Sequence, residues 1–341
     1  MSELIELEPS DTRSEEEKPL LEIEDLRVTF PTEEGQVHAV RGVDLVVQPG
    51  ETLGVVGESG SGKSVTMLAV LGLLPRSAKV EGSARYRGEE LLGRDKRIRR
   101  YRGGRIAMIF QDPLTALNPV HRIGDQIAEA VRAHKPSIGR DGARRRAVEM
   151  LELVGIPQPG TRARQYPHEF SGGMRQRAMI AMAIANDPEV LVADEPTTAL
   201  DVTVQAQILE VIQEVQQETK AAVVFITHDL GVIARLADRV QVMYAGKIAE
   251  LGAVDDIFRD PRMPYTRGLL ESLPRLDAEG TERLRPIPGA PPSMVSPPPG
   301  CAFHPRCPMA QDICREEVPA LRFIEGTQWS ACHFAEVVGR L

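Results

Sequence analysis

The sequence has few aromatic residues and no long apolar run. Phe, Trp and Tyr make up 4% of 341 residues, and no apolar stretch approaches the ~18–20 residues that a membrane-spanning helix needs. Residues 1–19 are acidic and lack the basic and apolar regions of a secretory signal. We therefore expect a chain that stays in the cytoplasm and begins with a disordered tail at residues 1–19.

The sequence also has fewer basic than acidic residues. Lys and Arg number 41 against 49 Asp and Glu, which gives a formal net charge of −8 at pH 7. A protein that binds nucleic acid nonspecifically usually has the opposite balance. The basic stretch at residues 85–105 contains only Tyr86 and Tyr101 as aromatic residues, so a solvated helix face is the favoured interpretation. We expect no nucleic-acid partner.

Cysteine is absent from the first 300 residues. All four cysteines lie near the C-terminus, at Cys301, Cys307, Cys314 and Cys332. Clustered thiols in a reducing compartment predict a metal site rather than disulfides. The spacing C-x5-C-x6-C-x17-C matches neither the tight pairs of zinc ribbons nor the bacterial ferredoxin pattern, so Zn²⁺ and an iron–sulfur cluster both stay open.

Strand and helix patterns alternate through the first three quarters of the chain. Residues 21–30 alternate apolar and polar, as a half-buried strand does. Four segments are apolar runs typical of strands buried on both faces: 52–56, 106–110, 190–193 and 222–226. Helical patterns occupy residues 64–74, which we expect to end at Pro75, and residues 125–134, 144–154, 175–186 and 205–218. The alternation predicts an α/β fold with a mainly parallel sheet covered by helices.

A glycine-rich loop follows one predicted strand and precedes a predicted helix. Residues 57–64 read GESGSGKS, which fits the P-loop pattern G-x-x-x-x-G-K-[ST]. Such a loop turns backbone N–H groups inward and places them at a helix N-terminus, which makes a nest for phosphate. Lys63 would bridge the outer phosphates, and the Ser64 hydroxyl would ligate Mg²⁺. The candidate nucleotide-binding residues here are Gly57, Ser59, Gly60, Ser61, Gly62, Lys63, Ser64 and Val65.

Two adjacent acidic residues end another predicted buried strand. In VLVADEP, residues 190–196, Asp194 and Glu195 stand at the carboxyl edge of the sheet, where open α/β folds bind ligands. Asp194 can hold Mg²⁺, and Glu195 can polarise a water in line with the terminal phosphoryl group. An acidic turn that merely caps the strand is the simpler interpretation, and the phosphate loop argues against it.

With these motifs, and with FSGGMRQR at residues 170–177, the chain resembles the ABC ATPase family over residues 20–255. The resemblance implies a P-loop, RecA-like nucleotide-binding domain that binds ATP and Mg²⁺. It also implies an antiparallel β subdomain, a helical subdomain at about residues 112–186, and a small cysteine-containing extension at residues 256–341. Met174 stands where the general family motif has glutamine, as in the peptide-permease branch.

Further positions take their expected roles from the same resemblance. Ser171, Gly172 and Gly173 would begin a helix that faces ATP bound by a second protomer. Gln111 would sense Mg²⁺ and water, His228 would contact the γ-phosphate, and Asp201 would communicate across the dimer. Phe30 is a candidate to stack on adenine, and core packing is the equal alternative. These assignments complete the candidate set Phe30, Gln111, Ser171, Gly172, Gly173, Asp194, Glu195, Asp201 and His228.

The runs DEPTTALDVTVQAQIL and PYTRGLL…IPGAPPS…GCAFHPRC are similar to the ATPases of oligopeptide and dipeptide permeases. This branch implies membrane permease subunits, a second ABC ATPase (a copy of this chain or a paralogue) and an extracytoplasmic peptide-binding protein as partners. It places the chain at the cytoplasmic face of the membrane and implies a [4Fe–4S] cluster at the four cysteines. Another solute such as nickel, or a non-transport ABC ATPase, is the alternative.

The proline-rich stretch at residues 286–299 predicts a stiff linker to the cysteine region. The last 40 or so residues have too few apolar residues for a large core, so a metal would stabilise them. We therefore expect the cysteine site and the nucleotide site to belong to separate folding units.

Overall fold

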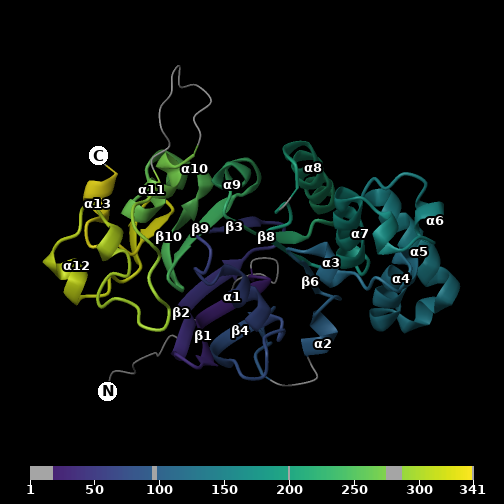
Figure 1. Cartoon of the computed structure of the whole chain (residues 1–341), viewed down its shortest axis with the longest axis horizontal. Helices are drawn as coiled ribbons and strands as arrows, with labels where there is room; N and C mark the ends of the chain where they lie inside the picture. Colours follow the sequence, from purple (N-terminus) through teal and green to yellow (C-terminus); the bar gives the residue numbers. More distant parts are fainter. Residues whose placement is uncertain (1–17, 94–97, 199, 274–285, 340–341) are drawn as a thin grey trace, which may run out of the picture.

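The computed structural model describes residues 18–93, 98–198, 200–273 and 286–339. These residues form two β-sheets, a group of helices at one end of the molecule and a C-terminal segment at the other end (Figure 1). The predicted tail at residues 1–19 lies almost entirely outside the described residues. Within the described ranges, no helix combines the length and the apolarity that crossing a bilayer requires.

The smaller sheet is antiparallel, in the order β2-β1-β4-β5. Its strands are β1 (Leu21–Thr32), β2 (Gly35–Val47), β4 (Lys79–Tyr86) and β5 (Glu89–Glu90). The predicted alternation in β1 is confirmed on either side of an irregularity at Glu24 and Asp25, because Leu21, Ile23, Leu26 and Val28 are buried. These side chains share an apolar core with α1 and β3, so the antiparallel sheet packs against the strand and the helix that flank residues 57–62.

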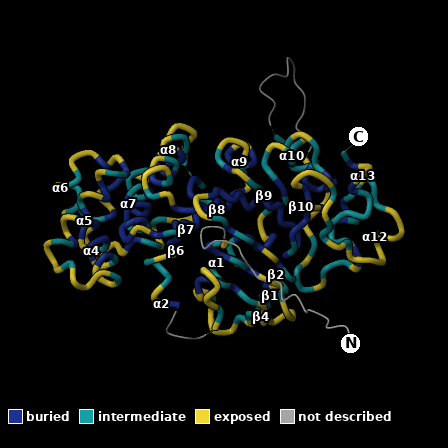
Figure 2. Tube along the Cα trace, turned by 180° about the vertical axis from the view of Figure 1, so that it is seen from behind, coloured by how far each residue is buried: buried dark blue, intermediate teal, exposed yellow. Residues whose placement is uncertain are grey.

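The larger sheet has eight strands, in the order β11-β12-β10-β9-β3-β8-β7-β6. Five neighbours run parallel: β9 (Arg239–Tyr244), β3 (Thr52–Val56), β8 (Ala222–Thr227), β7 (Val190–Asp194) and β6 (Ile106–Ile109). The strands β3, β6, β7 and β8 are buried at every residue, as their apolar runs predicted, and Figure 2 shows this dark-blue centre. Because they are parallel, their carboxyl ends meet at one edge of the sheet.

The helix after the phosphate loop is shorter than predicted. Helix α1 spans Lys63–Val70, and the predicted end at Pro75 is wrong. Gly72 adopts a left-handed φ of 62°, and the Leu73 N–H donates to the Leu68 carbonyl at 2.9 Å. This is a glycine-dependent helix end, and it acts before the proline can. Helices α8 (Val202–Thr219) and α9 (Leu230–Leu236) complete the cover of the sheet.

The chain between β6 and β7 forms the helical end of the molecule. Its elements are α3 (Pro113–Ala116), α4 (Ile123–His134), η2 (Pro136–Ile138), α5 (Gly139–Leu153), α6 (Pro159–Arg162), η3 (Pro167–Glu169) and α7 (Gly172–Ile184), and α2 (Ile98–Tyr101) precedes β6. Helices α4, α5 and α7 pack around Ile127, Ala147 and Ile180. Helix α5 begins at Gly139 rather than at Arg144. The prediction missed its first turn because that turn carries no apolar periodicity.

The C-terminal segment is joined to the larger sheet. It contains β10 (Lys247–Ala253), α10 (Val254–Arg259), α11 (Pro264–Glu271), η4 (His304–Arg306), α12 (Asp312–Glu316), β11 (Arg322–Glu325), β12 (Gln328–Ser330) and α13 (Ala335–Val338). Strand β12 pairs with β10, and both Tyr265 and Phe303 belong to the same apolar core as the parallel strands. The expectation of a separate folding unit is therefore wrong.

Candidate functional site

The phosphate loop connects β3 to α1, and at two of its positions no residue with a side chain can replace glycine. Gly57 and Gly62 have φ values of 151° and 100°, which side-chain-bearing residues rarely adopt. A Cβ on Gly57 would lie 2.2 Å from the Met243 carbonyl oxygen, and one on Gly62 would lie 2.5 Å from that of Ala39. The loop backbone is thus packed against neighbouring backbone, and its glycines are a steric requirement.

Lys63 is buried at the first residue of α1 and folds back over the loop. Its Nζ donates to the carbonyl oxygens of Gly57 at 2.7 Å and Glu58 at 3.0 Å. Burial lowers the pKa of Lys63, and the nearby carboxylates of Glu195, Asp194 and Glu58 oppose that shift. A desolvated ammonium at a helix N-terminus is suited to an anion with several charges.

Ser64 and Asp194 meet at the carboxyl edge of the sheet, as predicted. The Ser64 Oγ donates to Asp194 Oδ1 at 2.6 Å. Asp194 is only 6% exposed, and burial raises its pKa, while the hydrogen bond from Ser64 opposes the shift. A hydroxyl and a carboxylate in contact offer the hard oxygen ligands that Mg²⁺ prefers.

Glu195 is the centre of a second group of polar side chains. Its Oε2 accepts hydrogen bonds from Gln111 Nε2 at 3.0 Å and from Thr198 Oγ1 at 2.9 Å. His228 Nδ1 lies 3.5 Å from Oε1, and the His228 side chain is 63% exposed. The structure therefore brings together Gln111, Glu195 and His228, three residues that the sequence analysis singled out. It adds Thr198, which lies within TTALD and which the analysis missed.

The backbone of Glu195 is in an unusual conformation. Its φ is 45°, in the left-handed region that residues other than glycine enter at a cost. The Glu195 N–H donates to the Ile226 carbonyl at 2.8 Å, which continues the sheet pairing past the end of β7. The carboxylate is thus turned toward Gln111 and His228 by a conformation that the surrounding sheet enforces.

Ser171, Gly172 and Gly173, the signature residues, begin helix α7 (the signature helix) and leave its N-terminus exposed. Ser171 is the N-cap, and its Oγ accepts from the Met174 N–H at 3.3 Å. A Cβ on Gly173 would lie 2.8 Å from Val204 Cγ1, so glycine allows α7 to approach α8. Asp201 caps α8 by accepting from the Val204 N–H at 3.0 Å. Within the described residues, neither Ser171 nor Gly173 is hydrogen-bonded to residues 57–65.

Phe30 lies on β1 and is partly buried. It packs against the core shared by β1, α1 and β3, and part of its ring stays accessible. The structure is thus compatible with both interpretations that the sequence left open, core packing and a stacking surface.

The four cysteines gather around one small cavity. Cys301, Cys307, Cys314 and Cys332 are free thiols that line about 20 Å³ of space, and no carboxylate is among the lining residues. Burial raises the pKa of Cys332 to about 12, and the other three thiols add to this shift. In the described part of the chain, however, no group of three or more His, Cys, Asp or Glu side chains is placed to hold a metal ion. The predicted metal site is therefore not confirmed.

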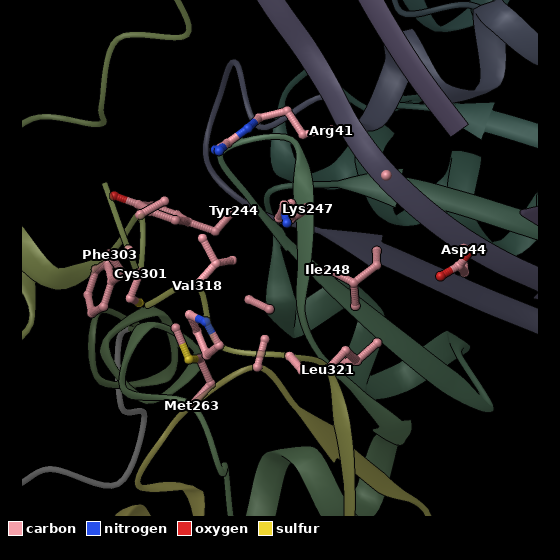
Figure 3. A pocket seen from close by; sticks show the side chains of 17 residues that line it. Arg41, Asp44, Tyr244, Lys247, Ile248, Met263, Cys301, Phe303, Val318 and Leu321 are labelled. Atoms are coloured by element: carbon pink, nitrogen blue, oxygen red, sulfur yellow. The ribbon is translucent and has the colours of Figure 1, made fainter. Parts of the chain in front are cut away.

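A larger cavity of about 350 Å³ lies between β2, β10 and residues 300–303 and 318–321. Figure 3 shows Tyr244, Phe303 and Cys301 at one side of it, with Arg41 and Lys247 nearby. Burial lowers the pKa of both Arg41 and Lys247. The cavity shows how closely the cysteine region approaches the sheet that carries the phosphate loop.

The C-terminal segment also contacts the phosphate loop directly, which the sequence analysis missed. Arg306 forms a bidentate ion pair with Glu58, the second residue of the loop, and the Glu58 N–H donates to the Tyr265 hydroxyl at 2.8 Å. Neither contact has a sequence signal, because 248 and 207 residues separate the partners.

Comparison with known proteins agrees with this geometry. Residues 40–198 match the family model described as ABC transporter, and residues 249–314 match that of the oligopeptide/dipeptide transporter C-terminal region. A dimeric ATP-binding cassette, MJ0796 bound to ADP and Pi, superposes with a TM-score of 0.62 at 25% identity, covering 69% of this chain and 98% of that one.

Two relatives are much more similar in sequence. The dipeptide transport ATP-binding protein DppD of Bacillus subtilis is 55% identical over 303 residues, which cover 88% of this chain and 90% of that protein. The oligopeptide transport ATP-binding protein OppD of Mycobacterium tuberculosis is 57% identical over 321 residues. The match covers 94% of this chain but 52% of the mycobacterial protein, so the chain spans about half the length of that relative.

The fold, the phosphate loop and the signature helix define an ATP-binding cassette of the P-loop class, with an antiparallel β-sheet and a helical part attached to a mainly parallel sheet. The chain belongs to the ABC transporter family, in the branch that carries the oligopeptide/dipeptide transporter C-terminal region.

Proposed function

We propose that this chain hydrolyses ATP and thereby drives an ABC importer for oligopeptides or dipeptides. The observation that carries the proposal is the environment of Glu195. Its carboxylate is held by Gln111 and Thr198 beside His228, at the same sheet edge as the Ser64–Asp194 pair. A fixed carboxylate next to a phosphate loop is the arrangement that activates water for phosphoryl transfer.

The residues divide the chemistry between them. Backbone N–H groups of residues 57–65 and the Lys63 ammonium bind the phosphates, while Ser64 and Asp194, with Gln111 nearby, would hold Mg²⁺. Bound Mg²⁺ neutralises charge on the phosphate oxygens. Glu195 would accept the proton of the attacking water, and His228, which lies beside the other oxygen of that carboxylate, would contact the terminal phosphate. Phe30 is proposed to stack on the adenine.

A second cassette completes the site. The exposed N-terminus of α7, with Ser171, Gly172 and Gly173, is proposed to bind the phosphates of ATP held by the partner, since an unpaired helix N-terminus attracts anions. Asp201 lies at the start of α8 and is proposed to transmit the state of one site to the other. The partner is a second copy or a paralogue of this chain.

The transport role follows from the branch of the family. Relatives that are 55–57% identical carry the names dipeptide and oligopeptide transport ATP-binding protein. By this likeness the chain works at the cytoplasmic face of the membrane, together with integral permease subunits and an extracytoplasmic peptide-binding protein. We assign residues 20–255 to the cassette, with its helical part at about 112–186, and residues 256–341 to the peptide-permease extension.

The four cysteines are proposed to hold a [4Fe–4S] cluster, with Zn²⁺ as the alternative. The kind of donor supports the proposal: four thiols that form no disulfide, and no carboxylate, line one cavity, and a cluster needs four thiolates. In the described residues the thiols are not yet placed around a metal position. The cluster would cross-link α12 and the segments that follow β10 and β12. A structural role suits this position better than electron transfer.

The partners test the transport proposal. The complex purified from the native host by a tag on this chain should contain permease subunits and a second ATPase, identified by mass spectrometry. Its ATP hydrolysis should rise when peptide and the peptide-binding protein are added. If nickel or another solute stimulates ATP hydrolysis and peptides do not, that solute and not a peptide is the transported substrate. Absence of any membrane subunit would contradict a transport role.

A further inference from the structure

Glu58 is held at three places although it lies in a loop. Its N–H donates to the Tyr265 hydroxyl at 2.8 Å, and its carbonyl accepts from Lys63 Nζ at 3.0 Å and from the Ser61 N–H at 3.2 Å. Its carboxylate accepts from Arg306 Nη1 at 2.6 Å and from Nη2 at 2.9 Å. Two of these three restraints come from the C-terminal segment.

Arg306 has little freedom to leave this position. Its side chain is 4% exposed, its Nε donates to the Pro288 carbonyl at 3.0 Å, and its Nη1 contacts the Tyr244 hydroxyl at 3.3 Å. The guanidinium carbon lies 5.9 Å from the ring centroids of both Tyr244 and Phe303. A bidentate pair in such surroundings is pre-organised, and removal of one partner leaves the other charge uncompensated.

The charge of Glu58 matters because of what the loop receives. A nucleoside triphosphate brings several negative charges to residues 57–64, and an unpaired carboxylate within that loop repels them. Arg306 cancels this charge through two hydrogen bonds. It also leaves the Glu58 carbonyl free to hold Lys63 and Ser61 in place.

The backbone that carries Arg306 is tied to the cysteine cavity. Arg306 ends the short helix η4, which lies between Cys301 and Cys307. The His304 N–H donates to the Cys301 carbonyl at 2.9 Å, and the Cys307 N–H donates to the His304 carbonyl at 3.3 Å. A change that displaces either cysteine therefore moves the turn from which Arg306 reaches the loop.

We propose that the turn between Cys301 and Cys307 is a positioning element of the nucleotide site, in which Arg306 neutralises and fixes Glu58, so that the state of the four cysteines sets the affinity for ATP. The inference rests on the proposed function, since it requires that residues 57–64 bind ATP. It gives the C-terminal extension a role in the nucleotide site of its own chain, beyond any contact with partners.

The test compares nucleotide dissociation constants of the full-length chain. The Arg306→Gln variant leaves Glu58 unpaired, so its Kd for ATP should rise about tenfold at low salt. Part of this loss should disappear at about 0.5 M salt, where exposed charges are screened. The Arg306→Gln, Glu58→Gln double variant should return to within about threefold of wild type, because the repelling charge is gone.

Three further substitutions make the result specific. Arg105→Gln removes an exposed ion pair with Glu189, outside the C-terminal segment, and should leave the Kd unchanged. Arg306→Lys keeps the charge and should bind more tightly than Arg306→Gln, which also covers the case that the glutamine variant folds poorly. Cys307→Ser should raise the Kd for ATP when it is made in the wild-type chain. When it is added to the Arg306→Gln, Glu58→Gln double variant, it should change the Kd by less than about twofold.

The outcomes separate the two proposals. A wild-type protein that fails to bind ATP would overturn the proposed function itself. Wild-type binding together with an unchanged Kd for Arg306→Gln would overturn only this inference. A double variant as weak as Arg306→Gln would show that the charge of Glu58 is not the cause. Equal effects of Cys307→Ser in both backgrounds would refute the link from the cysteines.

Discussion

Ser64 Oγ on α1 and Asp194 Oδ1 at the end of β7 lie 2.6 Å apart, although 130 residues separate them in the chain. The contact exists because β3 and β7 both flank β8 in one parallel sheet, so that the loop after β3 and the acidic pair after β7 reach the same edge. It joins the phosphate-binding loop to the proposed magnesium site and places Glu195, the next residue, beside both.

The Glu195→Gln variant should bind ATP with wild-type affinity and hydrolyse it at least ~100-fold more slowly, since the amide keeps the shape but cannot accept the proton. Turnover in the assembled complex and ATP binding by calorimetry measure the two effects. Glu210→Gln on the exposed side of α8 is a matched control. Near-wild-type turnover of Glu195→Gln would remove this residue from the chemistry.

The Lys63→Ala variant should lose nucleotide affinity itself, by about tenfold or more, because it removes the only described lysine that donates to the loop carbonyls. Lys79→Ala deletes an exposed lysine paired with Glu81 and should bind ATP normally. Fluorescence titration with a labelled nucleotide gives both constants. Equal affinities for the two variants would count against the assignment of the phosphate loop.

Stability should depend on pH through Glu250, which is 0% exposed on β10 and accepts from the Arg262 N–H. Burial raises the pKa of Glu250 from 4.5 to about 7. The folded chain therefore holds this proton to higher pH than the unfolded chain does. The free energy of unfolding therefore falls as the pH rises from 4.5 to about 7. Above this range it is lower by about 3 kcal/mol than it would be without the pKa shift.

The Glu250→Gln variant keeps an acceptor for Arg262 without the charge. Its melting temperature should exceed that of wild type by a few degrees at pH 8 and by much less at pH 5. Glu271→Gln, which alters an exposed pair with Arg267, should show no such dependence. A difference between Glu250→Gln and wild type that is the same at both pH values would contradict the assigned pKa.

Anaerobically purified protein should be brown, absorb near ~400 nm and contain about four iron atoms per chain, if the cysteines hold one cubane cluster. Cys307→Ser should bleach this absorbance and speed proteolysis between residues 301 and 332. One zinc and no iron would leave a structural zinc site. Four titratable thiols without either metal would end the metal proposal.

The sequence predicted the parts of the fold that depend on local patterns. The apolar runs of β3, β7 and β8 are buried on both faces, and Gly57, Gly60 and Gly62 have the positive φ values that favour glycine. The close approach of Gly57 to Met243 and of Gly62 to Ala39 could not be read from the loop itself.

The position of Asp194 at the carboxyl edge of the sheet followed from a general rule, that the carboxyl ends of parallel strands share one edge. Its hydrogen bond with Ser64 was not predicted. Gln111 and His228 could be placed only through the family resemblance.

Contacts between segments far apart in the chain could not be predicted. Arg306 and Tyr265 look like ordinary surface and helix residues in the sequence, and their contacts with Glu58 depend on how the C-terminal segment packs against the larger sheet. The early end of α1 was missed because Pro75 is a conspicuous stop signal, whereas Gly72 acts first. Thr198 was missed because one threonine in TTALD carries no pattern of its own.

Transport by the reconstituted complex tests the central claim most directly. Vesicles that contain the purified complex, with this chain and ATP on one side and labelled peptide with its binding protein on the other, should accumulate peptide on the ATP side. The Glu195→Gln complex should bind ATP yet neither hydrolyse it nor accumulate peptide, while the Glu210→Gln complex should do both. ATP-driven peptide accumulation that survives Glu195→Gln in this chain would contradict its role as the motor.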